Sequence, residues 1–162
     1  MKKPGLLPSL AALLPAVAGA ALLYSARPQE PLDRSLLDSA ATGEVIAEVG
    51  DGLTRVLSYG PDELDRTEES AKEVLRGRAA EQYRGLFARV RRESPAQGLS
   101  LRTRVVRAGV VELIDDRAVL LVFLDQTSGR DGEPEGGPAA AQLTVTARRE
   151  GGHWRITELK AT

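Results

Sequence analysis

The 162-residue sequence predicts an α+β domain behind a hydrophobic N-terminal segment. Apolar residues recur at helical spacing between Leu36 and Val90 and alternate with polar residues after Leu99. Glycine and proline interrupt these segments where turns are expected. Helices followed by a run of strands are typical of α+β folds, so we expect about three helices packed on a curved antiparallel sheet of about four strands.

The composition is that of a single folded domain. It contains 42% hydrophobic and 28% charged residues, which is typical of globular proteins. The formal net charge is −1 and basic residues are interspersed with acidic ones, so the surface lacks the continuous basic patch that nucleic acid requires. The chain has no cysteine, which excludes disulfides, thiolate metal sites, a cysteine nucleophile and a lipid-modified cysteine.

Residues 1–26 predict a membrane anchor or a signal sequence. Lys2 and Lys3 precede an uncharged apolar stretch that runs from Gly5 to Arg27. As a helix, this stretch would reach roughly 30 Å, which is the thickness of a bilayer core. In an anchor, the lysines stay in the cytoplasm by the positive-inside rule. The protein would then cross the plasma membrane once, with its N-terminus cytoplasmic and its domain outside.

The alternative is a cleaved signal peptide with residues 6–14 as its apolar region and a small-residue cleavage site within residues 16–20. We favour the anchor because cleavage there would leave the apolar residues 22–24 at the new N-terminus. Both interpretations export the rest of the chain. Residues 27–34, which include Pro28 and Pro31, predict a stiff linker before a domain at 35–162.

The first predicted helix spans residues 36–57. Three glycines, Gly43, Gly50 and Gly52, weaken it by roughly 1 kcal/mol each relative to alanine, so it must be stabilised by packing. Its apolar positions share one face: Leu36, Leu37, Ala40, Ala41, Val45, Val49, Leu53, Val56 and Leu57.

Two further helices are expected between the turn at Gly60-Pro61 and Gly98. Asp62 and Glu63 should occupy the first turn of the second helix, where negative charge suits the helix dipole. Gly77 should separate it from a third helix that Ser94-Pro95 and Gly98 should end. The apolar positions are Leu64, Ala71, Val74 and Leu75 in the second helix and Ala79, Ala80, Tyr83, Leu86, Phe87 and Val90 in the third.

Four strands are expected after Gly98. Residues 99–105 alternate between apolar and polar side chains, which predicts one solvent-facing side, and Gly109 indicates a bulge or bend. Residues 118–124 are apolar at every position, as in a central strand covered on both faces. After a glycine-rich acidic loop at 128–138, strands are expected at 141–149 and 153–159, with turns at 115–116 and 150–152. In the first of these strands alternation predicts Leu143, Val145 and Ala147 to point inward, and in the second Trp154 and Ile156 share a face.

Asp125 is the strongest candidate for a general base, because burial beside a hydrophobic strand raises the pKa of a carboxyl group. No second acid or histidine lies beside it in the sequence. The single histidine, His153, would have to belong to any histidine-dependent triad or metal site, but it lies in a glycine turn where solvent exposure is expected. We therefore predict no catalytic residue, no metal and no cofactor.

Polar residues at two places predict a docking surface instead. Asp125, Gln126 and Thr127 follow the apolar strand directly, where a strand is expected to meet solvent. A basic run on the third predicted helix could contact anionic lipid, although most such runs are only solvated. The candidates for docking are Asp125, Gln126, Thr127, Arg89, Arg91 and Arg92, and those for the core or a cavity lining are Tyr83, Phe87, Phe123, Leu143, Val145, Trp154 and Ile156.

Four stretches together resemble the Mce-associated membrane proteins of actinobacteria. They are VLSYGPDELD, GRAAEQYRGLFARV, RVVRAGVVELIDDRAVLLVFLDQT and GGHWRITEL, in this order and spacing. The resemblance covers residues 45–159, and that family also carries an N-terminal anchor. It implies the cone-shaped α+β fold of nuclear transport factor two, ketosteroid isomerase and the SnoaL-like cyclases. The family has no established catalytic residues.

The resemblance implies a non-catalytic accessory protein that stabilises or assists an Mce-type lipid or sterol importer. Its partners would be Mce proteins or their ABC permease, the membrane and a lipid or sterol. Two alternatives remain open. One is a tethered lipid carrier or an enzyme that uses the cone cavity, which fold analogy alone supports. The other, more distant alternative is a scaffold subunit of a secretion apparatus.

Overall fold

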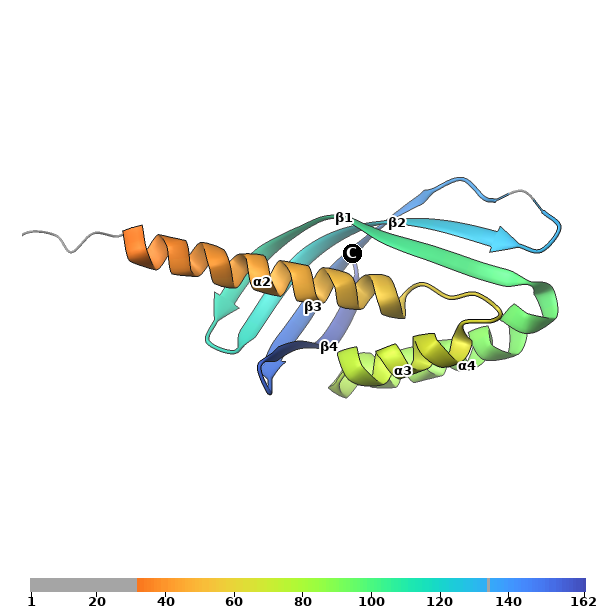
Figure 1. Ribbon diagram of the computed structural model, residues 1–162, viewed down its shortest axis with the longest axis horizontal. Helices are drawn as coiled ribbons and strands as arrows, with labels where there is room; N and C mark the ends of the chain where they lie inside the picture. Colours follow the sequence, from red (N-terminus) through yellow and green to blue (C-terminus); the bar gives the residue numbers. More distant parts are fainter. Residues whose placement is uncertain (1–31, 134) are drawn as a thin grey trace, which may run out of the picture. The chain divides into compact units, whose positions relative to one another are not determined.

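The computed structural model describes residues 32–133 and 135–162 (Figure 1). Residues Asp38–Thr162 form one compact unit. Among the helices of these described ranges, none is both long and apolar enough to cross a membrane. The predicted anchor at 1–26 and most of the predicted linker lie outside the described residues, so both remain predictions.

Three helices come first, as predicted: α2 is Leu32–Val56, α3 is Leu64–Val74 and α4 is Gly77–Gln97. The buried residues of α2 lie three or four positions apart, which puts them on one face: Val45, Val49, Leu53 and Val56. Helix α3 carries Asp65 in its first turn. Asp62 and Glu63 therefore precede this helix, and the prediction that they lie in its first turn is wrong.

Ser94-Pro95 and Gly98 were predicted to end α4. The helix continues through Pro95, so of these signals only Gly98 marks its end. Ser94 is fully buried, and its hydroxyl donates to the carbonyl of Leu99 over 2.6 Å. The helix ends at Gly98, which adopts a left-handed conformation with φ of 61°. Proline removes one backbone hydrogen bond, but here the burial of Ser94 and the glycine cap outweigh that loss in the last turn.

The sheet is an antiparallel meander with the strand order β1-β2-β3-β4. Its strands are β1 Leu99–Ile114, β2 Arg117–Arg130, β3 Ala139–Glu150 and β4 His153–Ala161. The predicted turns connect β1 to β2 and β3 to β4. Strand β2 continues to Arg130, beyond the end expected at Thr127, because Leu99 and Ser100 of β1 pair with Arg130 and Gly129.

Strand β1 lies at one edge of the sheet and contains two bulges. The register shifts between Val105 and Arg107 and again between Val110 and Glu112. Gly109 was predicted to be a bulge or bend, but it pairs in register with Leu121. Bulges of this kind bend an edge strand and hinder its pairing with other chains.

The helices pack on one face of the sheet (Figure 1). Alternate residues of β2 are buried beneath them: Ala118, Leu120, Val122 and Leu124. Val119, Leu121 and Phe123 face the other way, and Phe123 is 41% exposed. No described element covers this second face, so the prediction that the strand is covered on both faces is wrong.

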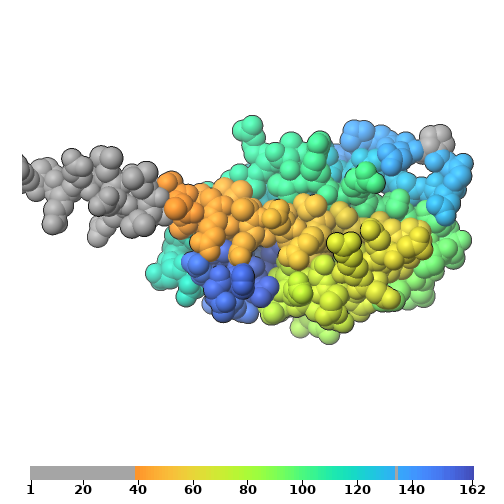
Figure 2. All heavy atoms as spheres, viewed as in Figure 1, coloured from red at the N-terminus to blue at the C-terminus, as the bar shows by residue number. Residues whose placement is uncertain are grey.

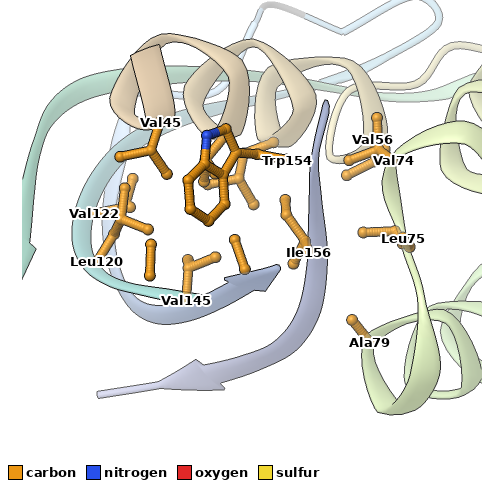
Figure 3. Close-up of a cluster of buried hydrophobic side chains, with 14 of the residues drawn as sticks. Val45, Val56, Val74, Leu75, Ala79, Leu120, Val122, Val145, Trp154 and Ile156 are labelled. Carbon is orange, nitrogen blue, oxygen red and sulfur yellow. The ribbon is translucent and has the colours of Figure 1, made fainter. Parts of the chain in front are cut away.

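The core lies between α2 and the sheet (Figure 3). Trp154 of β4 points into it, and Val145 and Ile156 are fully buried beside it, as the alternation of β3 and β4 predicted. Helices α3 and α4 and the short connection between them close the core with a further set of buried residues: Ala71, Val74, Leu75 and Ala79.

Gly52 allows α2 to approach α3 closely, and the two helices lie side by side at the surface (Figure 2). A Cβ atom on Gly52 would lie 2.8 Å from Cγ1 of Val74. A Cβ atom on Gly43 would meet nothing within 4 Å. Of these two glycines in α2, only Gly52 is required by the packing.

Candidate functional site

A cavity of about 640 Å³ lies between α4 and the sheet, and we call it the α4–sheet cavity. Its lining is mostly apolar and comes from the end of α2, from α4 and from three strands. The lining residues are Leu57, Ala79, Gln82, Tyr83, Gly85, Leu86, Arg89, Leu124, Gln126, Ala141, Leu143 and Leu159. A concave, apolar site with a few polar groups is typical of ligand or segment binding.

A hydrogen-bond network holds Gln126 in the wall of this cavity. The side-chain amide of Gln126 donates to Oγ1 of Thr103 over 3.1 Å, and that hydroxyl donates to the carbonyl of Leu57 over 2.7 Å. Ser58 accepts a hydrogen bond from the amide of Thr103 over 3.0 Å. The amide oxygen of Gln126 has no partner among the described residues, so it can accept a hydrogen bond from a bound group.

The chain segment after α2 also fixes this wall by pairing with the first residues of β1. Tyr59 and Leu101 exchange two backbone hydrogen bonds, of 2.8 and 2.9 Å. The Ser58-Tyr59 turn therefore holds α2 against β1. Thr103 is only 2% exposed, so its hydroxyl has to be satisfied within the protein.

Tyr83 separates the α4–sheet cavity from a second hollow. The second hollow, of about 540 Å³, lies between α3 and α4 and is bordered by Tyr83, Phe87 and Arg91 among others. The rings of Tyr83 and Phe87 are stacked with their centroids 5.0 Å apart. The hydroxyl of Tyr83 is buried and has no hydrogen-bond partner among the described residues. Burial, assisted by the charge of Glu68, raises the pKa of Tyr83, so this hydroxyl stays protonated.

The mouth of the α4–sheet cavity combines an exposed leucine with a basic side chain. Leu86 is 67% exposed although it lines the cavity, and Arg89 lies one helical turn further along α4. Arg89 makes no ion pair within the described part of the chain. The site can therefore hold an apolar group and place a positive charge near its exit.

Of the predicted docking residues, Gln126 and Arg89 line this cavity, but the others do not. Asp125 and Thr127 face the opposite side of the sheet, because successive residues of a strand point to opposite faces. The carboxylate of Asp125 pairs there with Arg104 over 3.1 Å. Arg91 borders the second hollow and pairs with Asp65 and Glu68, and Arg92 is exposed on α4. The six residues thus do not form one surface.

The predicted core and cavity residues divide into three groups. Tyr83 and Leu143 line the α4–sheet cavity, and Phe87 borders the second hollow. The buried core contains Val145, Trp154 and Ile156. Phe123 is the exception, because it lies on the uncovered face of the sheet, and the prediction that it lines the core or a cavity is wrong.

His153 is exposed and pairs with Glu48 of α2, with 2.9 Å between Nδ1 and Oε1. Partial burial alone would raise the pKa of Glu48. Hydrogen bonds from the Trp154 amide and the His153 ring, together with the charges of His153 and Arg155, outweigh this effect and lower the pKa. The contact joins α2 to the turn between β3 and β4. The described residues contain no group of histidine and acidic side chains placed to hold a metal ion.

Thr103 and Gln82 belong to the site but were not among the residues predicted from the sequence. Gln82, Leu86 and Arg89 are spaced four and three residues apart, so they line up on one face of α4. That spacing was a usable signal in the sequence. Thr103 gave none, because its role depends on the carbonyl of Leu57, which is 46 residues away.

Comparison with protein-family models gave no match. The chain is 34% identical over 160 residues to the outer membrane protein Rv1973 of Mycobacterium tuberculosis, covering 96% of this chain and 93% of that protein. It is 35% identical over 122 residues to the uncharacterized protein Rv1362c of the same species. That match covers 75% of this chain and 56% of Rv1362c, so the chain spans about half the length of this relative.

Solved structures with the same fold include two of the VirB8 type. CagV of Helicobacter pylori, a VirB8 homologue of a T4SS, has a TM-score of 0.58 and 10% identity, covering 75% of this chain and 97% of CagV. VirB8 of Agrobacterium tumefaciens has a TM-score of 0.53 and 17% identity, covering 74% and 90% of the two chains. These similarities confirm the predicted α+β fold of three helices on a four-stranded antiparallel sheet.

Proposed function

Because the chain belongs to the family of the Mycobacterium tuberculosis outer membrane protein Rv1973, we propose that it is a membrane-associated protein of the cell envelope. In this proposal its domain binds other envelope components and catalyses no reaction. The α4–sheet cavity is the observation that carries the proposal. It offers an apolar surface and a few hydrogen-bonding groups, as a binding site does.

The polar groups of the cavity support binding rather than acid-base chemistry. The amide of Gln126 titrates at no accessible pH, and the Tyr83 hydroxyl stays protonated. The guanidinium group of Arg89 only donates hydrogen bonds. Asp125, the strongest candidate for a base in the sequence, faces the other side of the sheet and pairs with Arg104. General acid-base catalysis needs a group that can exchange a proton within hydrogen-bonding reach of the substrate.

The specific form that we propose is an accessory subunit of an Mce-type lipid or sterol import system. This assignment is supported by the sequence resemblance to the Mce-associated proteins. It requires a single membrane-spanning anchor at residues 1–26 and a domain on the outer side of the plasma membrane. Mce proteins or their ABC permease are the partners that this form of the proposal names.

An assembly subunit of a secretion apparatus is the second candidate. It is favoured by the fold that the domain shares with CagV, a VirB8 homologue of a T4SS. Both candidates assign the domain to binding within an envelope assembly. They differ only in the partners.

The test is a mild-detergent purification of the tagged full-length protein from its own membranes, with mass spectrometry of the proteins and lipids that accompany it. Mce proteins or an ABC permease would support the first candidate, and secretion components would support the second. A preparation without any protein partner that carries one lipid species would overturn the proposal in favour of a tethered carrier.

A matched pair of variants separates a cavity ligand from an accompanying lipid. Ala141 lines the cavity, whereas its neighbour Ala140 is exposed on the other face of the sheet. Ala141→Trp fills the cavity, and Ala140→Trp adds the same side chain outside it. A lipid that is lost from the first variant and retained by the second occupies the cavity.

A further inference from the structure

The uncovered face of the sheet carries an apolar strip along β2, formed by Val119, Leu121 and Phe123. The bulges of β1 add two exposed valines beside it: Val106 is 56% exposed and Val111 is 70% exposed. A central strand that is apolar on both faces is typical of sheets covered on both sides. Contiguous exposed apolar surface of this kind commonly marks an interaction site.

Arginines surround this strip. Register places Arg102, Arg104 and Arg107 of β1 on the same face, opposite Thr127, Asp125 and Phe123. At the other end, Arg117 of β2 pairs in register with Arg148 of β3. The outward positions of β1, β2 and β3 include three carboxylates, Glu112, Asp125 and Glu150, which form ion pairs with Arg117, Arg104 and Arg76 respectively.

Three arginines of this face, Arg102, Arg107 and Arg148, have no ion pair within the described ranges. The face therefore carries an excess of positive charge. Arg107 and Arg148 are both exposed, and they lie beside opposite ends of the strip. A second copy of the chain would bring the same excess of arginines to this surface. Like charges would then oppose self-association, so the charge favours an acidic partner.

Beside the strip, Gly109 of β1 leaves a gap in the row of outward side chains, which we call the notch. Gly109 lies opposite Leu121 on the outward face, and a Cβ atom on Gly109 would meet nothing within 4 Å. From Val119 to Phe123 the strip is about 13 Å long, since a strand rises roughly 3.3 Å per residue. Residues i, i+4 and i+8 of a helix span about 12 Å. A narrow strip with a notch fits a protein segment better than a flat lipid surface.

We propose that this uncovered face docks an acidic, amphipathic segment of a partner protein. The apolar side chains of the segment cover Leu121 and Phe123 and enter the notch at Gly109, and its carboxylates pair with Arg107 and Arg148. This inference rests on the proposed function, because it names a docking surface for an envelope partner. That surface is separate from the α4–sheet cavity.

Site-specific photocrosslinking in the full-length chain, in its own envelope, tests the proposal. A benzophenone amino acid replaces Thr144, which pairs with Leu121 on this face, and a control replaces Arg66, an exposed residue of α3. We expect position 144 to crosslink to a protein segment with an apolar face and more carboxylates than basic residues. Position 66 should not crosslink to that segment.

Charge variants make the test specific. Arg107→Gln combined with Arg148→Gln should reduce the crosslink at least about tenfold, since each pair contributes to affinity. Arg66→Gln removes a different exposed arginine and should leave the crosslink unchanged. A synthetic copy of the crosslinked segment should bind the full-length chain in detergent, and replacing its glutamates with glutamines should weaken binding by a similar factor.

Crosslinks to lipid, to a second copy or to a neutral or basic segment would overturn the inference, as would the absence of any crosslink. The proposed function fails separately. If the double arginine variant still co-purifies with the partner of the wild-type protein, the docking face is wrong while the envelope-binding role stands.

Discussion

Replacing Gly52 by alanine should destabilise the domain although alanine is the better helix former. In an exposed helical position the change is worth about 1 kcal/mol in favour of alanine. At Gly52 the new Cβ atom would lie 2.8 Å from Cγ1 of Val74, 3.5 Å from its Cγ2 and 3.8 Å from Cδ1 of Ile156. Carbon atoms prefer a separation of about 3.5–4.0 Å, so the first of these contacts is a clash.

The clash should outweigh the gain in helix propensity. Val74 is 3% exposed and Ile156 is fully buried, so neither side chain can turn toward solvent. Overpacking of a core costs about 1–3 kcal/mol. The net effect of Gly52→Ala is therefore a loss of up to about 2 kcal/mol in the free energy of unfolding. Gly43→Ala is the matched control, because its Cβ atom is unobstructed, and it should gain up to about 1 kcal/mol.

The measurement is urea and thermal unfolding of both full-length variants in mild detergent, followed by the fluorescence of Trp154, the single tryptophan. A change of 1 kcal/mol corresponds to roughly 4 °C in Tm for a domain of this size. The gain in helix propensity is common to both variants, so they should differ by the overpacking cost of about 1–3 kcal/mol, which corresponds to roughly 4–12 °C. If Gly52→Ala proved as stable as Gly43→Ala, the close approach of α2 and α3 would be refuted.

Three further predictions concern single polar side chains. Thr103→Val should lower the free energy of unfolding by about 1–3 kcal/mol, because the change preserves the shape of the side chain but leaves the Leu57 carbonyl and the Gln126 amide without their partner. Urea unfolding measures this loss, and Thr144→Val, at a more exposed threonine, is the control. Tyr83→Phe should leave the free energy of unfolding unchanged or raise it by up to about 1 kcal/mol, because the buried hydroxyl has no hydrogen-bond partner among the described residues. A clear loss of stability in the same assay would show that the hydroxyl does have a partner. The lowered pKa of Glu48 contributes stability that is present above the ordinary value of 4.5 and is lost as pH falls through the folded-state pKa. Glu48→Gln should therefore make the free energy of unfolding less dependent on pH in the acidic range. An unchanged pH dependence would contradict the contact between Glu48 and the β3–β4 turn.

Much of the fold could be predicted because periodicity reports which side of an element meets the core. The spacing of Val45, Val49 and Leu53 predicted the buried face of α2, and the alternation of Val145 and Ala147 predicted that of β3. The glycine turn before His153 was equally clear. These features depend on residues that are neighbours in the sequence.

The candidate site was only partly predictable, because it depends on residues that are far apart in the sequence. Tyr83, Leu143, Gln126 and Arg89 were named in advance, but nothing in the sequence indicated that they share one cavity. Asp125 and Gln126 are adjacent in the sequence yet point to opposite faces of the sheet. Grouping them as one surface failed because β2 continues through both residues to Arg130, and successive residues of a strand point to opposite faces.

The sequence by itself determined the order of helices and strands, the inward positions of β3 and β4, and the absence of cysteine chemistry. Only the tertiary structure decided that residues 118–124 are covered on one side, that β2 extends to Arg130, and that Gly52 is a packing position whereas Gly43 is not. The physical reason is that the local sequence pattern indicates only how apolar each residue is. What covers that residue depends on elements that lie far away in the chain.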